Sequence, residues 1–146
     1  MGRKLPKYDN YIEKLSLYCR ASEIAIEHKE YDGDGAYVPT RRKIILDRDL
    51  DESTEVAVLL HECGHMLDDA LNDPIELKKL DKAYMAFYKN EANDEQKELV
   101  YACEERAWNC GRAVAKKLRI KLGNWYDEEE LISLADYRDE AENEQN

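Results

Sequence analysis

The residues with the clearest chemical potential lie in one short stretch, His61-Glu62-Cys63-Gly64-His65, which matches the pattern H-E-x-x-H. On a helix, residues four apart lie on the same face, one turn above another. His61 and His65 would therefore place two imidazoles side by side, at a spacing suited to one metal ion. Glu62 points about 100° away from His61 around the helix. We therefore expect Glu62 to flank the ion beside a bound water and to act as a general base.

The surrounding sequence predicts the helix that this pattern requires. Apolar residues recur at helical spacing through residues 53–69, STEVAVLLHECGHMLDD. Asp51 is suited to cap the start of this helix, and Glu52 and Glu55 favour the positive end of its dipole. The chain contains 3 histidines, and two of them fall in the motif. We interpret the motif as a zinc-binding site rather than as polar residues on a surface helix.

A catalytic zinc site needs a third protein ligand and an open position. The double acid Glu104-Glu105 lies in a predicted helix at about residues 95–119, whose apolar stripe includes Cys103 and Ala107. At about 100° per residue, Glu104 lies at the edge of this stripe and Glu105 points toward solvent. The periodicity favours Glu104 as the third ligand and leaves Glu105 as the alternative.

With His61-Glu62-x-x-His65 followed by Glu104-x-x-Ala107, the sequence resembles small gluzincin-type zinc metallopeptidases. It is similar in particular to the minimal gluzincins of phages and mobile elements and to the ImmA/IrrE-type group. The resemblance implies Zn2+ as the cofactor, His61, His65 and Glu104 as its ligands, and a peptide or protein as the substrate. It also implies that Glu62 is the catalytic base of a zinc-activated water.

The resemblance covers roughly residues 8–118, with one departure close to the third ligand. Trp108 stands where larger gluzincins have an aspartate that can orient a histidine. Tyr37 and Tyr101 are candidates for donating a hydrogen bond to a developing oxyanion. Gly111 would allow its helix to approach the motif helix closely. The alternative function is a non-catalytic zinc-binding protein that interacts with a partner as a pseudoenzyme.

Hydrophobic periodicity predicts an α+β fold over residues 1–146, and the resemblance implies that these residues form a single zincin-like domain. We expect about five helices and a small antiparallel sheet of about three strands that precedes the motif helix. A polar, frayed tail is expected at about residues 139–146. The predicted helices cover about residues 7–20, 53–69, 74–89 and 95–119, with a last one from Asp127, and the strands lie at about 23–28, 36–38 and 43–46.

Composition narrows the possible partners and the compartment. The chain has 33 acidic and 22 basic residues, a formal charge of -11, which disfavours binding to nucleic acid. The first residues, MGRKLPKYDNYIEK, contain no apolar core of a secretion signal, and no apolar run reaches the length of a membrane span. We therefore expect a cytoplasmic protein that does not enter a membrane. Its thiols are expected to be reduced, at Cys19, Cys63, Cys103 and Cys110.

Overall fold

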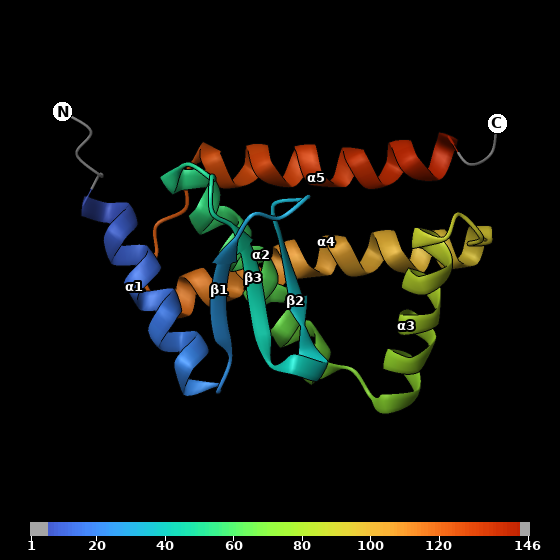
Figure 1. Ribbon diagram of the computed structural model, residues 1–146, viewed down its shortest axis with the longest axis horizontal. Helices are drawn as coiled ribbons and strands as arrows, with labels where there is room; N and C mark the ends of the chain where they lie inside the picture. The colour runs from blue at the N-terminus through green and yellow to red at the C-terminus, as the bar shows by residue number, and fades with distance from the viewer. Residues whose placement is uncertain (1–5, 144–146) are drawn as a thin grey trace.

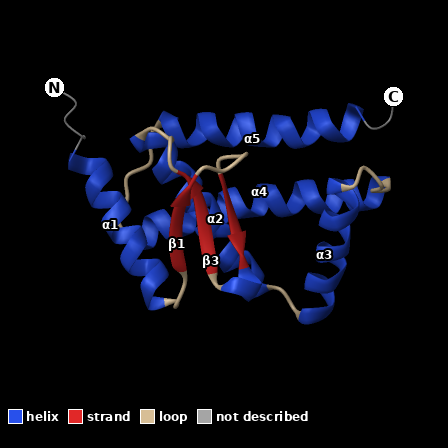
Figure 2. Ribbon diagram, viewed as in Figure 1, coloured by secondary structure: helices blue, strands red, loops and turns tan. Residues whose placement is uncertain are grey.

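Five helices and a three-stranded sheet make up the part of the chain that the computed structural model describes, residues 6–143 (Figures 1 and 2). Side chains are described for residues 7–138. The predicted α+β class and the number of elements are confirmed. In chain order the elements are α1 (Pro6–Ala21), β1 (Ala25–Lys29), β2 (Gly35–Val38), a 3-10 turn (Pro39–Arg41), β3 (Lys43–Asp47), α2 (Glu52–Leu71), α3 (Pro74–Tyr88), α4 (Asp94–Lys117) and α5 (Asn124–Asn143).

The sheet is mixed, and its strand order is β1-β3-β2. Strand β2 pairs with β3 in antiparallel fashion, as predicted, whereas β1 pairs with β3 in parallel, so the prediction of an antiparallel sheet is wrong for this pairing. Strand β3 buries Ile44 and Leu46 completely, whereas β1 is polar and largely exposed. The most apolar strand therefore takes the centre, where neighbours cover both of its edges, and separates β1 from β2.

The motif helix α2 packs across one face of the sheet and lies directly against α4 (Figure 1). Its start is capped as predicted, because the Asp51 side chain accepts a hydrogen bond from the Thr54 N–H at 2.9 Å. Glycines make the close contact with α4 possible. A Cβ added at Gly64 would lie 1.9 Å from the carbonyl oxygen of Ala107, and one added at Gly111 would lie 2.9 Å from that of Leu60. The prediction that Gly111 allows close helix approach is confirmed.

The remaining helices frame this pair. Helix α3 begins after Asp73, whose side chain caps it by accepting a hydrogen bond from the Glu76 N–H, and it crosses the far end of α4, while α5 runs alongside α4 (Figure 1). Helix α5 begins at Asn124, before the predicted Asp127, and continues through Asn143. The predicted frayed tail is therefore wrong for residues 139–143, which extend this helix. Residues 144–146 of that tail lie outside the described residues.

All four cysteines are free thiols, as predicted. The Sγ atoms of Cys19 and Cys63 lie 3.5 Å apart in the core, which joins α1 to α2 by a contact that the sequence did not indicate. Between residues 6 and 143, no helix is both long and apolar enough to cross a membrane.

Candidate metal centre

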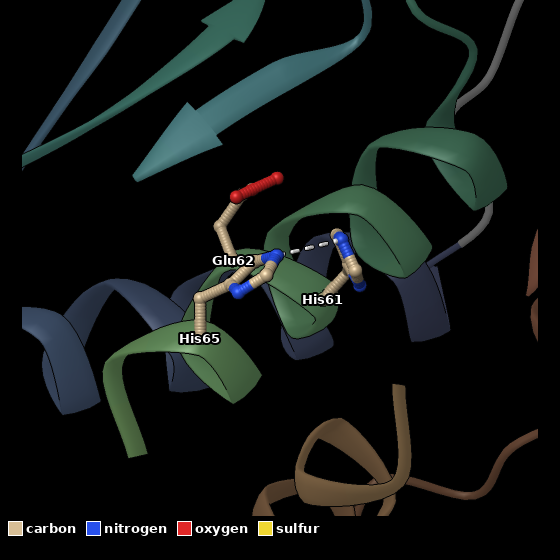
Figure 3. A group of neighbouring side chains, drawn as sticks. All are labelled: His61, Glu62 and His65. Carbon is tan, nitrogen blue, oxygen red and sulfur yellow. Dashed lines mark hydrogen bonds between the residues drawn. The ribbon is translucent and has the colours of Figure 1, made fainter. Parts of the chain in front are cut away.

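Helix α2 brings His61 and His65 together, as the four-residue spacing predicts. Their Nε2 atoms lie 3.2 Å apart, and the ring centroids are separated by 4.6 Å (Figure 3). His61 is buried, with 7% of its surface exposed, and His65 is partly buried. The interface between α2 and α4 therefore encloses two imidazole nitrogens that point to a common position.

Helix α4 adds Glu104 to this pair. Its Oε1 lies 3.1 Å from His61 Nε2, and its Oε2 lies 3.1 Å from His65 Nε2. Glu104 is 3% exposed, whereas Glu105 is exposed to solvent. The structure thus brings Glu104 to the histidines and leaves Glu105 away from them. The close contact between Gly64 and Ala107 brings these side chains together. Gly64 adjoins His65 on α2, and Ala107 lies one turn after Glu104 on α4.

The spacing of these donor atoms fits a tetrahedral zinc ion. Zinc binds imidazole nitrogen and carboxylate oxygen at about 2.0–2.2 Å, so two ligands of a tetrahedral ion lie about 3.3 Å apart. The two imidazole nitrogens are 3.2 Å apart, and each is 3.1 Å from an oxygen of Glu104. The donor set, two nitrogens and one carboxylate, is also one that catalytic zinc sites use. His61, His65 and Glu104 could therefore hold the ion with little rearrangement.

Glu62 also lies close to the imidazoles but points elsewhere. Its ligand-type atom falls within 4.8 Å of those of His61 and His65, so it could in principle be a ligand itself. Its side chain points from α2 toward the strands rather than toward the space between the rings (Figure 3). There the main chain of Tyr37 lies close enough to lower the pKa of the carboxyl, against the larger effect of burial. We assign the third ligand position to Glu104, which reaches both nitrogens, and the flanking position to Glu62.

Burial and the neighbouring charges shape the ionisation of the two carboxylates differently. Burial raises the pKa of the Glu62 carboxyl above its ordinary value, although the imidazoles act in the opposite direction. Burial would also raise the pKa of Glu104, but the charge on His65 and hydrogen bonds from both histidines hold it well below the ordinary range. Glu104 in turn raises the pKa of His65 well above its ordinary value, against the effect of burial. The charges of His65 and Glu104 therefore favour the ionised form of each other's side chain.

The outer nitrogens of the two imidazoles have different surroundings. The His61 ring stacks on Trp108, with centroids 4.3 Å apart and an interplanar angle of 28°. Its Nδ1 has no hydrogen-bond partner among the described residues. His65 Nδ1 lies 4.0 Å from the Sγ of Cys103. Trp108, which stands where larger gluzincins have an aspartate, thus fixes the His61 ring by stacking and not by a hydrogen bond.

An ion pair between a buried aspartate and an exposed arginine supports the His65 ring from further out. Asp68 is 4% exposed and forms an ion pair with Arg106, with 3.0 Å between Oδ1 and Nε. Cys103 donates a hydrogen bond to Asp68 Oδ2 at 3.7 Å. Asp68 and Arg106 therefore bridge α2 and α4 beside His65, a connection that the sequence analysis missed because it depends on the packing of two helices.

A tyrosine that the sequence analysis did not select also reaches the cluster. The Tyr84 hydroxyl, on α3, donates to Glu104 Oε2 at 2.5 Å. Burial and the charge of Glu104 raise the pKa of this phenol well above its ordinary value. Of the two tyrosines considered as oxyanion donors, Tyr37 lies on β2 and contacts Glu62 through its main chain. The ring of Tyr101 lies instead under Arg138, with 3.7 Å between the ring centroid and the guanidinium carbon of Arg138.

Comparison of the chain with protein-family models, with curated proteins and with solved structures finds no match. The argument for function therefore rests on the side chains of this site and on their geometry.

Proposed function

We propose that this protein is a zinc-dependent peptidase that acts in the cytoplasm on peptide or protein substrates. The observation that carries the proposal is the convergence of His61, His65 and Glu104, with 3.1–3.2 Å between their donor atoms. A separate buried carboxylate, Glu62, lies beside them and points to another side of α2. A zinc site that only stabilises a fold has no use for this additional carboxylate.

The chain's own residues would divide the work as follows. Zinc, when bound, supplies a Lewis acid for the substrate carbonyl and lowers the pKa of a bound water to about 7. Glu62 would accept a proton from the attacking water and return it to the leaving amine. Burial raises the pKa of the Glu62 carboxyl, which makes the carboxylate a stronger base toward water and suits a group that must both accept and return a proton.

The outer edge of β2 offers a way to hold an extended peptide. The N–H of Asp47 bonds to the carbonyl of Asp34 across the β2–β3 ladder. Because the pattern alternates in an antiparallel pair, Gly35 and Tyr37 turn their main-chain groups away from β3. Tyr37 is also the residue whose main chain contacts Glu62. A peptide that added a strand to this edge would therefore run past the general base.

One observation favours a second candidate, a zinc-binding pseudoenzyme that interacts with a partner. Glu62 is 5% exposed and Glu104 is 3% exposed, so the centre is more enclosed than an open catalytic site requires. In this alternative, Glu62 would serve only to anchor β2 to α2 through Tyr37. The two candidates differ in whether Glu62 is needed for hydrolysis, and the next experiment measures that difference.

The test compares the parent protein with Glu62→Gln. Zinc is measured by elemental analysis, and cleavage is measured on a mixed peptide library by mass spectrometry. Glutamine keeps the size of the side chain and an acceptor oxygen but cannot carry the proton. We expect one zinc per chain in both proteins, and a loss of cleavage in the variant on the order of a hundredfold or more. Cleavage by Glu62→Gln at the parent's rate would refute the mechanism, and a zinc-loaded parent that cleaves nothing would favour the pseudoenzyme.

A further inference from the structure

Tyr84 brings a third helix to the candidate metal centre. It lies on α3, whereas the histidines and Glu104 lie on α2 and α4. Its hydroxyl donates to Glu104 Oε2 at 2.5 Å. Its ring packs against a small apolar cluster of Ala83, Phe87 and Val100. The phenol is therefore held in place by packing and is directed at one particular oxygen atom.

The two oxygens of Glu104 consequently differ in their surroundings. Oε1 lies 3.1 Å from His61 Nε2. Oε2 lies 3.1 Å from His65 Nε2 and also receives the Tyr84 hydroxyl. A hydrogen bond to one carboxylate oxygen occupies a lone pair of that atom and leaves the other oxygen free to bind the metal. We infer that Tyr84 is a positioning residue, which holds Glu104 so that it binds the metal through one oxygen only.

This inference rests on the proposed zinc site and deepens it. A carboxylate that binds through one oxygen occupies a single coordination position, which leaves a position for water beside two histidines. A carboxylate that used both oxygens would take up part of that space. Tyr84 would thus favour the open, catalytic form of the site. It would act through Glu104 and not on the substrate.

The same helix provides a matched control. Tyr88 lies one turn after Tyr84, and the two rings stack with centroids 6.0 Å apart. Tyr88 is 67% exposed and has a side-chain hydrogen bond to Tyr137 rather than to Glu104. Changing Tyr88 to Phe therefore removes a hydroxyl from the same helix and the same aromatic pair, while the carboxylate keeps its partner.

The experiment measures metal binding in the parent, Tyr84→Phe and Tyr88→Phe. Zinc affinity is obtained by competition with a chromophoric chelator, and Co2+ absorption spectra report the coordination number. Phenylalanine keeps the ring in the apolar cluster and removes only the hydroxyl, with its interactions with Glu104 and Cys103. We expect Tyr84→Phe to raise the Kd for zinc by roughly 10- to 100-fold, the usual range for an outer partner of a ligand. We also expect weaker Co2+ bands in Tyr84→Phe, typical of a higher coordination number, and parent-like values in Tyr88→Phe.

A Kd for Tyr84→Phe within twofold of the parent, with an unchanged Co2+ spectrum, would overturn the inference and leave the proposed zinc site intact. A parent that binds neither metal would overturn the zinc site itself, so the two failures are distinguishable. A crystal structure of the zinc-loaded parent gives a test that does not depend on the variant. It should contain the Tyr84 hydroxyl within hydrogen-bond distance of the Glu104 oxygen that does not bind zinc, and a carboxylate bound through both oxygens would contradict the inference.

Discussion

The α2–α4 pair and helix α3 contribute side chains to the same cluster, but they are held in the molecule in different ways. Helices α2 and α4 meet backbone to backbone at Gly64 and Ala107, and α2 alone buries ten side chains or glycines. Helix α3 buries only Leu80, Ala83 and Phe87, and it exposes large apolar side chains such as Ile75. The groups proposed to bind the metal lie on the tightly packed pair, whereas Tyr84, which would adjust one of them, lies on the loosely held helix.

This difference indicates how a small chain can build a site that is both rigid and adjustable. Ligand atoms must keep their spacing to within a few tenths of an ångström, and closely packed helices shift little relative to one another. A partner that only orients a ligand tolerates more freedom. The cluster around Phe87 and Val100 is separate from the main core, so α3 packs against α4 through its own small group of apolar side chains.

The largest expected effect comes from breaking the contact itself with Gly64→Ala. The added Cβ would lie 1.9 Å from the Ala107 carbonyl oxygen, and neither helix backbone can yield easily. Alanine normally stabilises a helix relative to glycine by about 0.5–1 kcal/mol. A loss of stability in Gly64→Ala would therefore come from the clash between the two helices and not from helix propensity. We expect a loss of about 3 kcal/mol or more in the free energy of unfolding, measured by urea denaturation.

Ala113→Ser, which adds one atom to an exposed position of α4, serves as the control for this substitution. It should change the free energy of unfolding by less than about 0.5 kcal/mol. A Gly64→Ala protein that is as stable as the parent would show that the two helices can separate without loss.

The next effect concerns the metal and compares adjacent acids on α4. Glu104→Ala removes the carboxylate 3.1 Å from both imidazoles, whereas Glu105→Ala changes an exposed side chain. We expect the Kd for zinc to rise by more than about a hundredfold in Glu104→Ala, beyond the range for outer partners, and to stay unchanged in Glu105→Ala. Elemental analysis after dialysis measures this difference. Retention of zinc by Glu104→Ala together with its loss from Glu105→Ala would reverse the ligand assignment.

A smaller effect is expected at the start of α2, with a defined dependence on pH. The Asp51 carboxylate accepts hydrogen bonds from Thr54, which hold the pKa of Asp51 below its ordinary value. A lowered pKa in the folded state means that the carboxylate stabilises the fold above its unfolded pKa of about 3.9, and that this contribution is lost as the pH falls through the folded value. Asp51→Ala should therefore cost about 1 kcal/mol at pH 7, and less below about pH 4.

Urea denaturation at the two pH values measures the Asp51 effect, and Asp51→Asn is its control. Asparagine also caps helices but does not titrate, so its stability relative to Asp51→Ala should be independent of pH. A cost of Asp51→Ala that stays the same in acid would contradict the assignment of the cap to the ionised carboxylate.

The smallest change in global stability is expected from the equivalent cap on α3. Asp73 accepts a hydrogen bond from the Glu76 N–H at 2.8 Å, which closely matches the cap of α2. If α3 opens independently of the core, Asp73→Ala should leave the urea midpoint almost unchanged while hydrogen exchange accelerates at the amides of α3 alone. Equal acceleration in α3 and α4 would mean that the two helices unfold together and that the contrast between them is wrong.

Much of the site was readable from the sequence because its information is local. The four-residue spacing of His61 and His65 sets the relation of two side chains on one helix, whatever lies around it. The apolar stripe of α4 similarly indicated that Glu104 faces the interior and Glu105 does not, and their exposures agree. The caps of α2 and α3 depend on residues at most three positions apart, and the cap of α2 by Asp51 was predicted.

The relations between elements were decided only by tertiary packing. The parallel pairing of β1 with β3 arises because the most apolar strand takes the centre of the sheet, which no local pattern specifies. The contact between Tyr84 and Glu104 spans 20 residues, and that between Cys19 and Cys63 spans 44. Periodicity indicates which face of a helix points inward, but it contains no information on which other inward face it meets. That choice depends on how all the side chains fill the interior together, so it appears only in the folded molecule.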